Sequence, residues 1–372
     1  MGTLEKYTIL ELSRHGSGQA LGMLLADQGA EVLKYEPPGG DLFRKDHSFS
    51  VWNRGKKSFV ANMNDSNDLS LIRNMVKATD VTIENLDPGE AKELSLTYSD
   101  LAKTNPRLIM ISLTGFPANH KYENLPSREE LISTVSGVYS MNPPGASPIH
   151  GEGPSFHEVP YSSSFAALTA APAVISALLM RNITGQGQEI LLSGHDAMFQ
   201  GMGSRLVRNA NKDHGRQDGH PIIDRFYQCS DGRWINNNIG SYDRFLKPFL
   251  ETINNSEWFE HLTSPTDDPQ DLSEWRNKFA SVWRAKTAIE WETIMANAGV
   301  PVTMCRTVSE WIEVDHAEIS GAVINVDDPS YGLMKQPGIT VRTRGTVETP
   351  ISGAPKLGEH SIELKRRYNN EK

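Results

Sequence analysis

The first residues that could do chemistry are three glycines near the N-terminus, Gly16, Gly18 and Gly22. They follow a short apolar run, 8–12 (TILEL), that predicts a β-strand, and they begin a segment whose leucines predict a helix. Backbone N–H groups at a helix N-terminus have no partners within the helix and lie at the positive end of its dipole, so they attract phosphate. The spacing therefore predicts a site for a nucleotide or for the diphosphate of CoA.

A second strand is predicted at 31–36 (EVLKYE), and Gly29 ends the helix between the two strands as a C-cap glycine. A dinucleotide fingerprint has closely spaced glycines at this turn and an acidic residue on the second strand, where Glu36 stands. The run from Gly16 to Gly22 (GSGQALG) has one residue too many before its last glycine, and two prolines follow Glu36. These departures argue against NAD as the ligand.

A run of serines, 162–164, precedes the most apolar segment of the chain. A serine hydroxyl becomes a nucleophile only beside a base, and Glu129, His157 and Glu158 are the candidate bases. A serine in front of a helix also caps the first turn. Two interpretations of this run stay open, a nucleophile or a helix cap formed by Ser162, Ser163 or Ser164, and the cap is the interpretation that we favour.

Longer motifs occur in a fixed order along the chain. They are GMLLADQGAEVLKYEPPGGD, WNRGKKSFVANM, DVTIENLDPGEAKELSLTYSDL, NPRLIMISLTGF, VSGVYS, LLMRNITGQGQEILLSGHDA, GVPVTMCRTVSEW and APKLGEH. From about Leu10 to His360 this order resembles the class III CoA-transferase family, to which formyl-CoA transferase, carnitine CoA-transferase and alpha-methylacyl-CoA racemase belong. The resemblance implies a protein that handles CoA thioesters and carboxylic acids, with coenzyme A as the acyl carrier.

The resemblance also implies an α/β fold in an interlocked dimer. Each subunit would have a Rossmann-like large domain formed by both chain ends and a smaller inserted α+β domain. We expect the first part of the large domain at 1–203, a linker at 204–224, the small domain at 225–307, a second linker at 308–330, and the return to the large domain at 331–372. A chain of 372 residues is long enough to bury two cores.

Local patterns place further elements. Apolar periodicity predicts helices over 68–76 and 127–138, and the runs DVTIEN and LIMISLTG predict strands of a parallel sheet. The segment HPIIDRFYQCSDGRWINNNIG predicts a hairpin that turns at 230–232. The amides in 236–240 that follow could bind polar substrate groups or form a solvated turn, and the turn is the interpretation that we favour. Helices are expected from 242 to about 298.

The resemblance also implies that this chain lacks catalytic residues of the family. In active transferases of the family, an aspartate at the start of the long helix that ends in TGxGQ attacks the acyl-CoA thioester, and counting back from Thr184 places Ser163 at that position. A carboxylate is ionised at pH 7, whereas a serine hydroxyl needs a base and would form a stable ester. The place of the racemase histidine is occupied by Arg128-Glu129, and Glu129 falls on a position that is acidic in many relatives. Glu129 could keep an electrostatic or acid/base role, or it could equally be a carboxylate at a helix start that the helix dipole favours. Ser163 and Glu129 are therefore the catalytic candidates, and racemase activity is not expected.

The same resemblance implies the contacts with CoA. His15, Gly16 and Ser17 fall where the first loop of the family lies along CoA, and Asn85 and Leu86 fall where the second loop meets it.

The arginine that pairs with a CoA phosphate in many relatives aligns with Glu93, whose carboxylate would repel phosphate. Lys92 is adjacent, and Arg44 and Lys45 are further cations that could compensate for the missing charge.

The composition indicates which classes of partner and which cellular compartment to expect. A net charge of −9 and a pI near 5.7 argue against nucleic acid or an anionic membrane as the partner. Cys229 and Cys305 are the only cysteines, and no CxxC or HExxH spacing predicts a metal site. The N-terminus has no signal-peptide pattern, so we expect a cytoplasmic protein.

The longest apolar stretch, from Phe165 to Met180, is interrupted by Pro172 and is shorter than the ~20 residues that cross a bilayer. It predicts a buried helix rather than a membrane span.

Three functions remain. The preferred one is a subunit of a heteromeric CoA-transferase, paired with a family member that keeps the aspartate. The second is a self-sufficient acyl-CoA lyase, hydrolase or isomerase that uses Glu129 or Ser163, most simply as a homodimer. The third is a non-catalytic CoA-binding protein.

Overall fold

A computed structural model describes residues 2–140, 154, 156–203, 220–240, 242–264, 268–342 and 351–369. The chain forms two compact units. The first takes in the described parts of Met1–Tyr139, Phe156–Val207 and Asp315–Lys372, and the second takes in those of Ser140–Ser155 and Arg208–Val314. The two units are described separately below.

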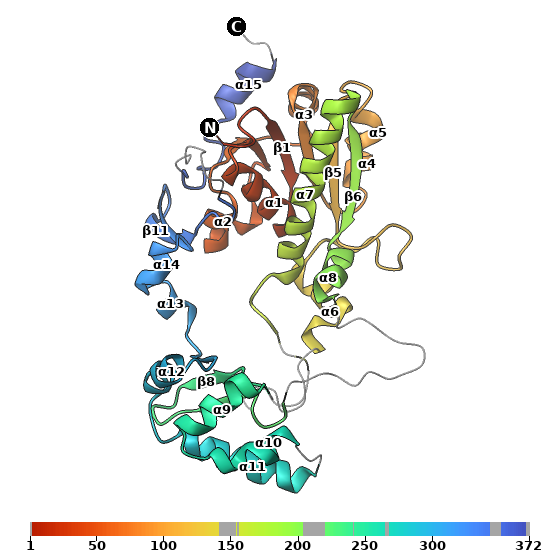
Figure 1. Ribbon diagram of the computed structural model, residues 1–372. Coiled ribbons are helices and arrows are strands. Elements are labelled where there is room, and N and C mark those ends of the chain that lie inside the picture. Colours follow the sequence, from red (N-terminus) through yellow and green to blue (C-terminus); the bar gives the residue numbers. More distant parts are fainter. Residues whose placement is uncertain are drawn as a thin grey trace. The chain divides into compact units, whose positions relative to one another are not determined.

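The first unit is built on a six-stranded sheet in the order β3-β2-β1-β4-β5-β6 (Figure 1). Every neighbouring pair is parallel. The strands are β1 Thr8–Ser13, β2 Glu31–Glu36, β3 Lys57–Val60, β4 Val81–Asn85, β5 Ile109–Thr114 and β6 Gln188–Ser193. The predicted α/β class and all the strands that the sequence predicted for this sheet are confirmed. The strand order reverses between β1 and β4, and at such a point ligands bind at the carboxyl ends of the strands.

Helices cover both faces of this sheet (Figure 1). On one face, α1 (Gly16–Asp27) and α7 (Tyr161–Thr184) bury a core with alternate side chains of the central strands, such as Ile9 and Ile83. On the other face, α3 (Ser66–Ala78) and α15 (Ser361–Asn369) pack on Leu10, Leu12 and Phe59. Because successive side chains of a strand point to opposite faces, a strand between two helical layers is apolar throughout.

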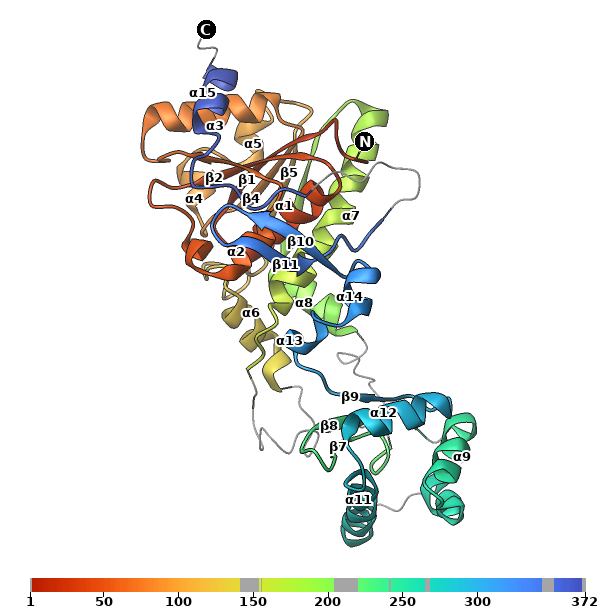
Figure 2. The same ribbon diagram turned by 90° about the vertical axis from the view of Figure 1, so that its left-hand side faces the viewer.

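The C-terminal helix α15 returns to the beginning of the chain. Figures 1 and 2 both show it beside α3, and Leu364 is fully buried there. The backbone N–H of His360 donates to the carbonyl of Ser58 at 2.9 Å, and the Lys57 ammonium lies 2.9 Å from the Glu363 carboxylate. Both ends of the chain therefore build the first unit.

Helix α7 differs from its prediction. It is continuous through Pro172 over 24 residues, so by length and composition it could cross a membrane. One side packs against α1, α8 (Gly194–Met202), β5 and β6, as a core helix does. Its other side exposes Leu168, Leu179 and Ile183, so the expectation of a buried helix holds for one face only.

Shorter elements complete the first unit. They are η1 Leu42–Lys45, α2 His47–Trp52, α4 Glu90–Glu93, α5 Tyr98–Leu101, α6 Glu129–Ser136, η2 Val138–Ser140, α14 Asp315–Ile319 and an antiparallel pair, β10 Val323–Asp328 with β11 Gly332–Pro337. The helices predicted over 68–76 and 127–138 appear as α3 and α6.

The second unit has a three-stranded antiparallel sheet, β7 (Phe226–Gln228), β8 (Trp234–Asn237) and β9 (Val302–Met304). The predicted hairpin is confirmed, with Gly232 at φ +77° in its turn. The predicted polar turn at 236–240 is partly wrong, because Asn236 and Asn237 belong to β8 and the Asn237 side chain is buried. The helices are α9 Asp243–Thr252, η4 Ser256–Trp258, α10 Phe259–Thr263, α11 Pro269–Trp283, α12 Ala288–Asn297 and α13 Val308–Trp311.

Candidate functional site

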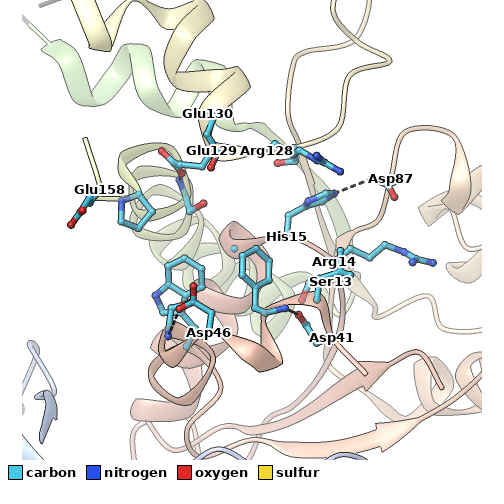
Figure 3. A pocket seen from close by; sticks show the side chains of 18 of the residues that line it. Ser13, Arg14, His15, Asp41, Asp46, Asp87, Arg128, Glu129, Glu130 and Glu158 are labelled. Carbon is cyan, nitrogen blue, oxygen red and sulfur yellow. Dashed lines mark hydrogen bonds and ion pairs between the residues drawn. The ribbon is translucent and has the colours of Figure 1, made fainter. Parts of the chain in front are cut away.

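A cavity of about 700 Å³ opens at the carboxyl ends of β1 and β4 in the first unit (Figure 3). It lies where the reversal of strand order predicts a ligand site. Its walls come from the loops after β1, β2 and β4, from α2, and from the starts of α6 and α7. The lining residues are Ser13, Arg14, His15, Gly16, Pro37, Gly40, Asp41, Leu42, Phe43, Asp46, Ser48, Trp52, Asp87, Ser127, Arg128, Glu129, Glu130, Phe156, His157, Glu158, Pro160 and Ser163.

Glu129 caps helix α7 from the first turn of α6. Its Oε1 accepts the backbone N–H of Ser162 at 2.8 Å, and its Oε2 accepts that of Ser163 at 2.8 Å. Oε1 also accepts the Ser133 hydroxyl at 3.0 Å. No serine side chain caps α7, since the N-cap residue is Pro160 and makes no side-chain cap bond. The prediction of a serine cap is therefore wrong: the cap is a carboxylate from another helix, which sequence spacing does not reveal.

The Ser163 hydroxyl faces the cavity without a base. Ser163 is 7% exposed, and within the described part of the chain its Oγ makes no hydrogen bond. Both Glu129 oxygens accept the backbone bonds described above, and His157 and Glu158 line the same cavity without bonding Ser163. The structure thus brings together the two residues predicted as catalytic, but as a capped helix end rather than as a nucleophile with its base.

Because Gly16 has no side chain, α1, α2 and α7 pack closely beside the cavity. A Cβ on Gly16 would lie 2.6 Å from the Trp52 ring and 3.0 Å from Ser163 Oγ, both closer than ordinary contact. Any side chain here would displace Trp52 or fill the space in front of Ser163. The first glycine of the N-terminal run therefore shapes the cavity directly.

His15, the N-cap residue of α1, lines the cavity beside Gly16. Its Nε2 lies 3.0 Å from Asp87 Oδ1 on the loop after β4 (Figure 3). Burial lowers the pKa of His15 against the opposing pull of Asp87, and the positive charges of Arg128 and Arg14 add to the lowering. The imidazole is therefore mainly neutral at pH 7 and available for hydrogen bonding rather than ion pairing.

The other residues predicted to contact CoA do not line the cavity. Ser17 Oγ donates to Asn85 Oδ1 at 3.2 Å, and Asn85 Nδ2 donates to the Leu113 carbonyl at 2.5 Å. These bonds link the start of α1 to the ends of β4 and β5. Leu86 belongs to the core under α3, and Lys92 is exposed on α4. Their contact with CoA stays a prediction.

Arg44 is not free to pair with a phosphate. Its Nε and Nη2 donate to the two Glu36 carboxylate oxygens at 2.5 Å each, and Ser58 Oγ donates to Glu36 Oε1 at 2.5 Å. This bidentate pair holds the loop after β2 against the sheet. Of the cations expected to compensate for Glu93, Arg44 is therefore corrected to a structural residue, and neither Lys45 nor Lys92 lines the cavity.

A buried ionic cluster, which the sequence did not predict, lies beneath the cavity. Lys56 Nζ donates to Glu11 Oε2 at 2.6 Å and to Asn53 Oδ1 at 3.0 Å, while Lys34 Nζ donates to Asp41 Oδ2 at 2.8 Å and to Glu11 Oε1 at 3.3 Å. Burial lowers the pKa of Lys56 to about 8 despite Glu11. Burial alone would also lower the pKa of Lys34, but Glu11 and Asp41 outweigh it and raise that pKa. The cluster ties Asp41, a residue of the cavity wall, to the core.

Gly22 makes room for this cluster. A Cβ on Gly22 would lie 1.9 Å from Glu11 Oε2 and 2.9 Å from Lys56 Nζ. The last glycine of the run thus leaves room for a buried ion pair under α1.

Comparison with known proteins gives a consistent result. The sequence model described as CoA-transferase family III matches residues 4–361. The chain is 26% identical to succinyl-CoA–D-citramalate CoA-transferase of Chloroflexus aurantiacus, over 97% of this chain and 92% of that protein. It is 28% identical to acetyl-CoA:oxalate CoA-transferase of Acetobacter aceti, over 99% of this chain and 96% of that protein.

CoA-transferase/lyase DddD of a Marinomonas species is also similar, with 26% identity over 95% of this chain. The chain spans about half of that relative, since the match covers 47% of it. Among solved structures, a CAIB/BAIF family protein from Brucella suis superposes with a TM-score of 0.80 at 25% identity, over 99% of both chains. The Rv3272 protein from M. tuberculosis reaches a TM-score of 0.83 at 20% identity, over 98% of this chain and 99% of that one, and shows the same fold.

Proposed function

The chain belongs to CoA-transferase family III, and we propose on this premise that it is the subunit without a nucleophile in a heteromeric enzyme that moves CoA between carboxylic acids. Its cavity takes a CoA thioester, and a family member that keeps the aspartate supplies the attacking carboxylate. Two of the similar proteins are CoA-transferases for D-citramalate and for oxalate, which supports a thioester and a carboxylic acid as the substrates of this chain.

The observation that carries the proposal is the state of Ser163. The hydroxyl lies at the start of α7 and in the cavity, at the position where the aspartate is expected, and it has no hydrogen-bonded base in the described part of the chain. Glu129, whose carboxylate bonds the start of α7, accepts two backbone N–H groups instead. A nucleophilic serine needs a general base within hydrogen-bond reach, so this arrangement favours a subunit that relies on another chain for the covalent step.

The DddD relative gives independent support. Because 47% of that protein aligns with this chain, a stretch of about the same length lies outside the match. A single enzyme with room for a second unit of family size is consistent with two family members acting together.

The test is co-expression with a family member from the same genome that keeps the aspartate. We expect stable co-purification, transfer of CoA from succinyl-CoA to an acceptor acid by the complex, and no transfer by this chain alone. Replacing the partner's aspartate by alanine serves as the control and should abolish transfer. Transfer by this chain alone, or by the partner at an unchanged rate without this chain, would contradict the proposal.

A second function, a self-sufficient acyl-CoA lyase, hydrolase or isomerase, is favoured by one observation, the presence of Ser163 and Glu129 in the same cavity. It requires turnover by the isolated chain that Glu129→Gln or Ser163→Ala abolishes, and turnover that neither change affects would contradict it. Ser164→Ala is the matched control, since Ser164 is the next residue of the same helix and lies outside the cavity lining. The heteromeric function instead requires that Ser163→Ala leaves transfer by the complex unchanged.

A further inference from the structure

The positive charges that line the cavity differ in their partners. Arg14 forms an ion pair with Glu90, and the His15 imidazole bonds Asp87. The Arg128 side chain, among the cavity-lining residues that the structure describes, makes neither a hydrogen bond nor an ion pair, and it is exposed at the start of α6. Arg128 is therefore available to bind a ligand in the cavity.

From this placement we propose that Arg128 binds a phosphate group of CoA, in place of the arginine that is lost at Glu93. The inference rests on the proposed function, because it takes the cavity to be a CoA site. A guanidinium offers a planar set of donors that matches two phosphate oxygens at once and stays charged at any physiological pH. The residue lies one position before Glu129 and therefore at the edge of the same cavity that holds Ser163.

The surroundings of Arg128 favour an anion. Figure 3 shows Arg128, His15 and Arg14 gathered on one side of the cavity, next to the loop that carries Asp87. The positive charges of Arg128 and Arg14 both act on His15, which shows that they share one region. This region is bounded by the loops after β1 and β4, where the family resemblance places CoA.

Carboxylates also line the cavity, but most of them already have partners. Asp41 accepts from Lys34 at 2.8 Å, Asp46 accepts the Ser48 backbone N–H at 2.8 Å, and Asp87 and Glu129 have the partners given above. Hydrogen bonding to N–H groups and cations offsets the negative charge that they present to a ligand. Glu130 and Glu158 are the acidic residues of the lining that oppose an anion most directly, and Glu130 is the nearer to Arg128 in sequence.

Isothermal titration with CoA tests the proposal on the full chain. Arg128→Gln should weaken CoA binding by about 10- to 100-fold, because a charge-assisted hydrogen bond is lost. Arg128→Lys should recover part of the loss, since it keeps the charge but not the bidentate geometry. Glu130→Gln should strengthen binding by removing an opposing charge.

Two ligands identify the phosphate. If Arg128 contacts the 3′-phosphate, wild type and Arg128→Gln should bind dephospho-CoA with equal affinity. If it contacts the diphosphate, the difference should persist with dephospho-CoA and vanish with pantetheine, which lacks both groups.

Lys77→Gln is the matched control, because Lys77 is exposed on α3 of the same unit, lies outside the cavity lining and carries the same charge. An equal loss of affinity in Lys77→Gln would assign the effect to net charge and overturn the proposal. Unchanged CoA affinity in Arg128→Gln would overturn it too, while leaving the proposed function intact. Failure of the wild-type chain to bind CoA, both alone and with its partner, would overturn the proposed function and this inference together.

Discussion

Glu129 serves two helices, because it begins α6 and its carboxylate closes the N-terminus of α7. The first N–H groups of a helix have no partners inside the helix, and an acidic group at that end also interacts favourably with the helix dipole. The N-cap residue of α7 is Pro160, which makes no side-chain cap bond. The Glu129 carboxylate instead accepts the backbone N–H groups of Ser162 and Ser163. A position that looks catalytic in the sequence therefore has a structural task in this chain.

Glu129→Ala should lower the free energy of unfolding by about 0.5–2 kcal/mol, the usual cost of losing a helix cap. Urea denaturation measures this difference. Glu130→Ala is the control, since Glu130 is exposed on the same turn and caps nothing in the described structure, and it should change stability by less than about 0.5 kcal/mol. Equal effects of the two substitutions would contradict the capping role.

Helix α1 lies over a buried ionic cluster, and Gly22 provides the clearance. Glu11 on β1 joins Lys34 on β2 to Lys56, the residue before β3, and Lys56 Nζ also donates to the carbonyl of Gln19 in α1. Removing one partner from such a group leaves a buried charge without compensation, which is more costly than the pair is favourable. The cluster thus fixes the position of the helix whose N-terminus forms part of the cavity.

Gly22→Ala should destabilise the first unit by about 1–3 kcal/mol, because the added methyl group overlaps Glu11 Oε2 and forces the cluster apart. The midpoint of thermal unfolding measures the change. Gly39→Ala serves as the comparison, as a Cβ at Gly39 meets no atom within 4 Å. A Gly22→Ala protein as stable as Gly39→Ala would show that α1 shifts freely over the cluster.

The lowered pKa of Lys56 predicts a pH dependence of stability. The folded state releases the Lys56 proton near pH 8, whereas the unfolded chain keeps it up to the ordinary lysine value of 10.5. Between these values the unfolded chain binds more protons, so the contribution of Lys56 to stability rises with pH. Wild type should therefore gain stability relative to Lys56→Met from pH 8 to pH 10 in urea titrations. A constant difference between the two proteins over this range would exclude a lowered pKa of Lys56.

At the scale of the whole molecule, the first unit is assembled from segments far apart in the sequence. Residues 358–369 pack on β3 and α3, with Leu364 and Tyr368 in the core below them. Arg367 Nη1 also lies 2.8 Å from Glu31 at the start of β2. The chain therefore completes its N-terminal core only when its C-terminal segment is in place.

Truncation after Leu357 should lower the free energy of unfolding of the first unit by at least about 2 kcal/mol, the cost of emptying a single buried leucine site. Truncation after Asn369 is the control and keeps every contact of α15 described above. Denaturation followed by circular dichroism compares the two. If the shorter protein unfolds at the same urea concentration as the control, α15 adds nothing to the core.

Short-range features of the fold could be predicted from the sequence. Strand and helix types follow from local apolar periodicity. The glycine run after β1 indicates the end of the sheet at which the cavity opens, because that turn depends on local geometry. The motif order from Leu10 to His360 indicated the family, and the match over residues 4–361 confirms it. That Ser163 stands in place of the family's aspartate stays a prediction, since it depends on counting residues back from Thr184.

Only the tertiary structure decided which side chains meet. The Glu129 cap, the Glu36–Arg44 pair and the Glu11–Lys34–Lys56 cluster join residues from different elements, and periodicity within one element carries no information about such pairs. The exposed face of α7 was not predicted either, because an apolar segment does not show by itself which of its sides other elements cover. The sequence by itself therefore determined the family and the class of sheet. Folding decided which charges pair with one another, because the partner of each charge is set by contacts between distant segments, and within the residues that the structure describes it left Arg128 at the cavity without an ion pair or hydrogen bond.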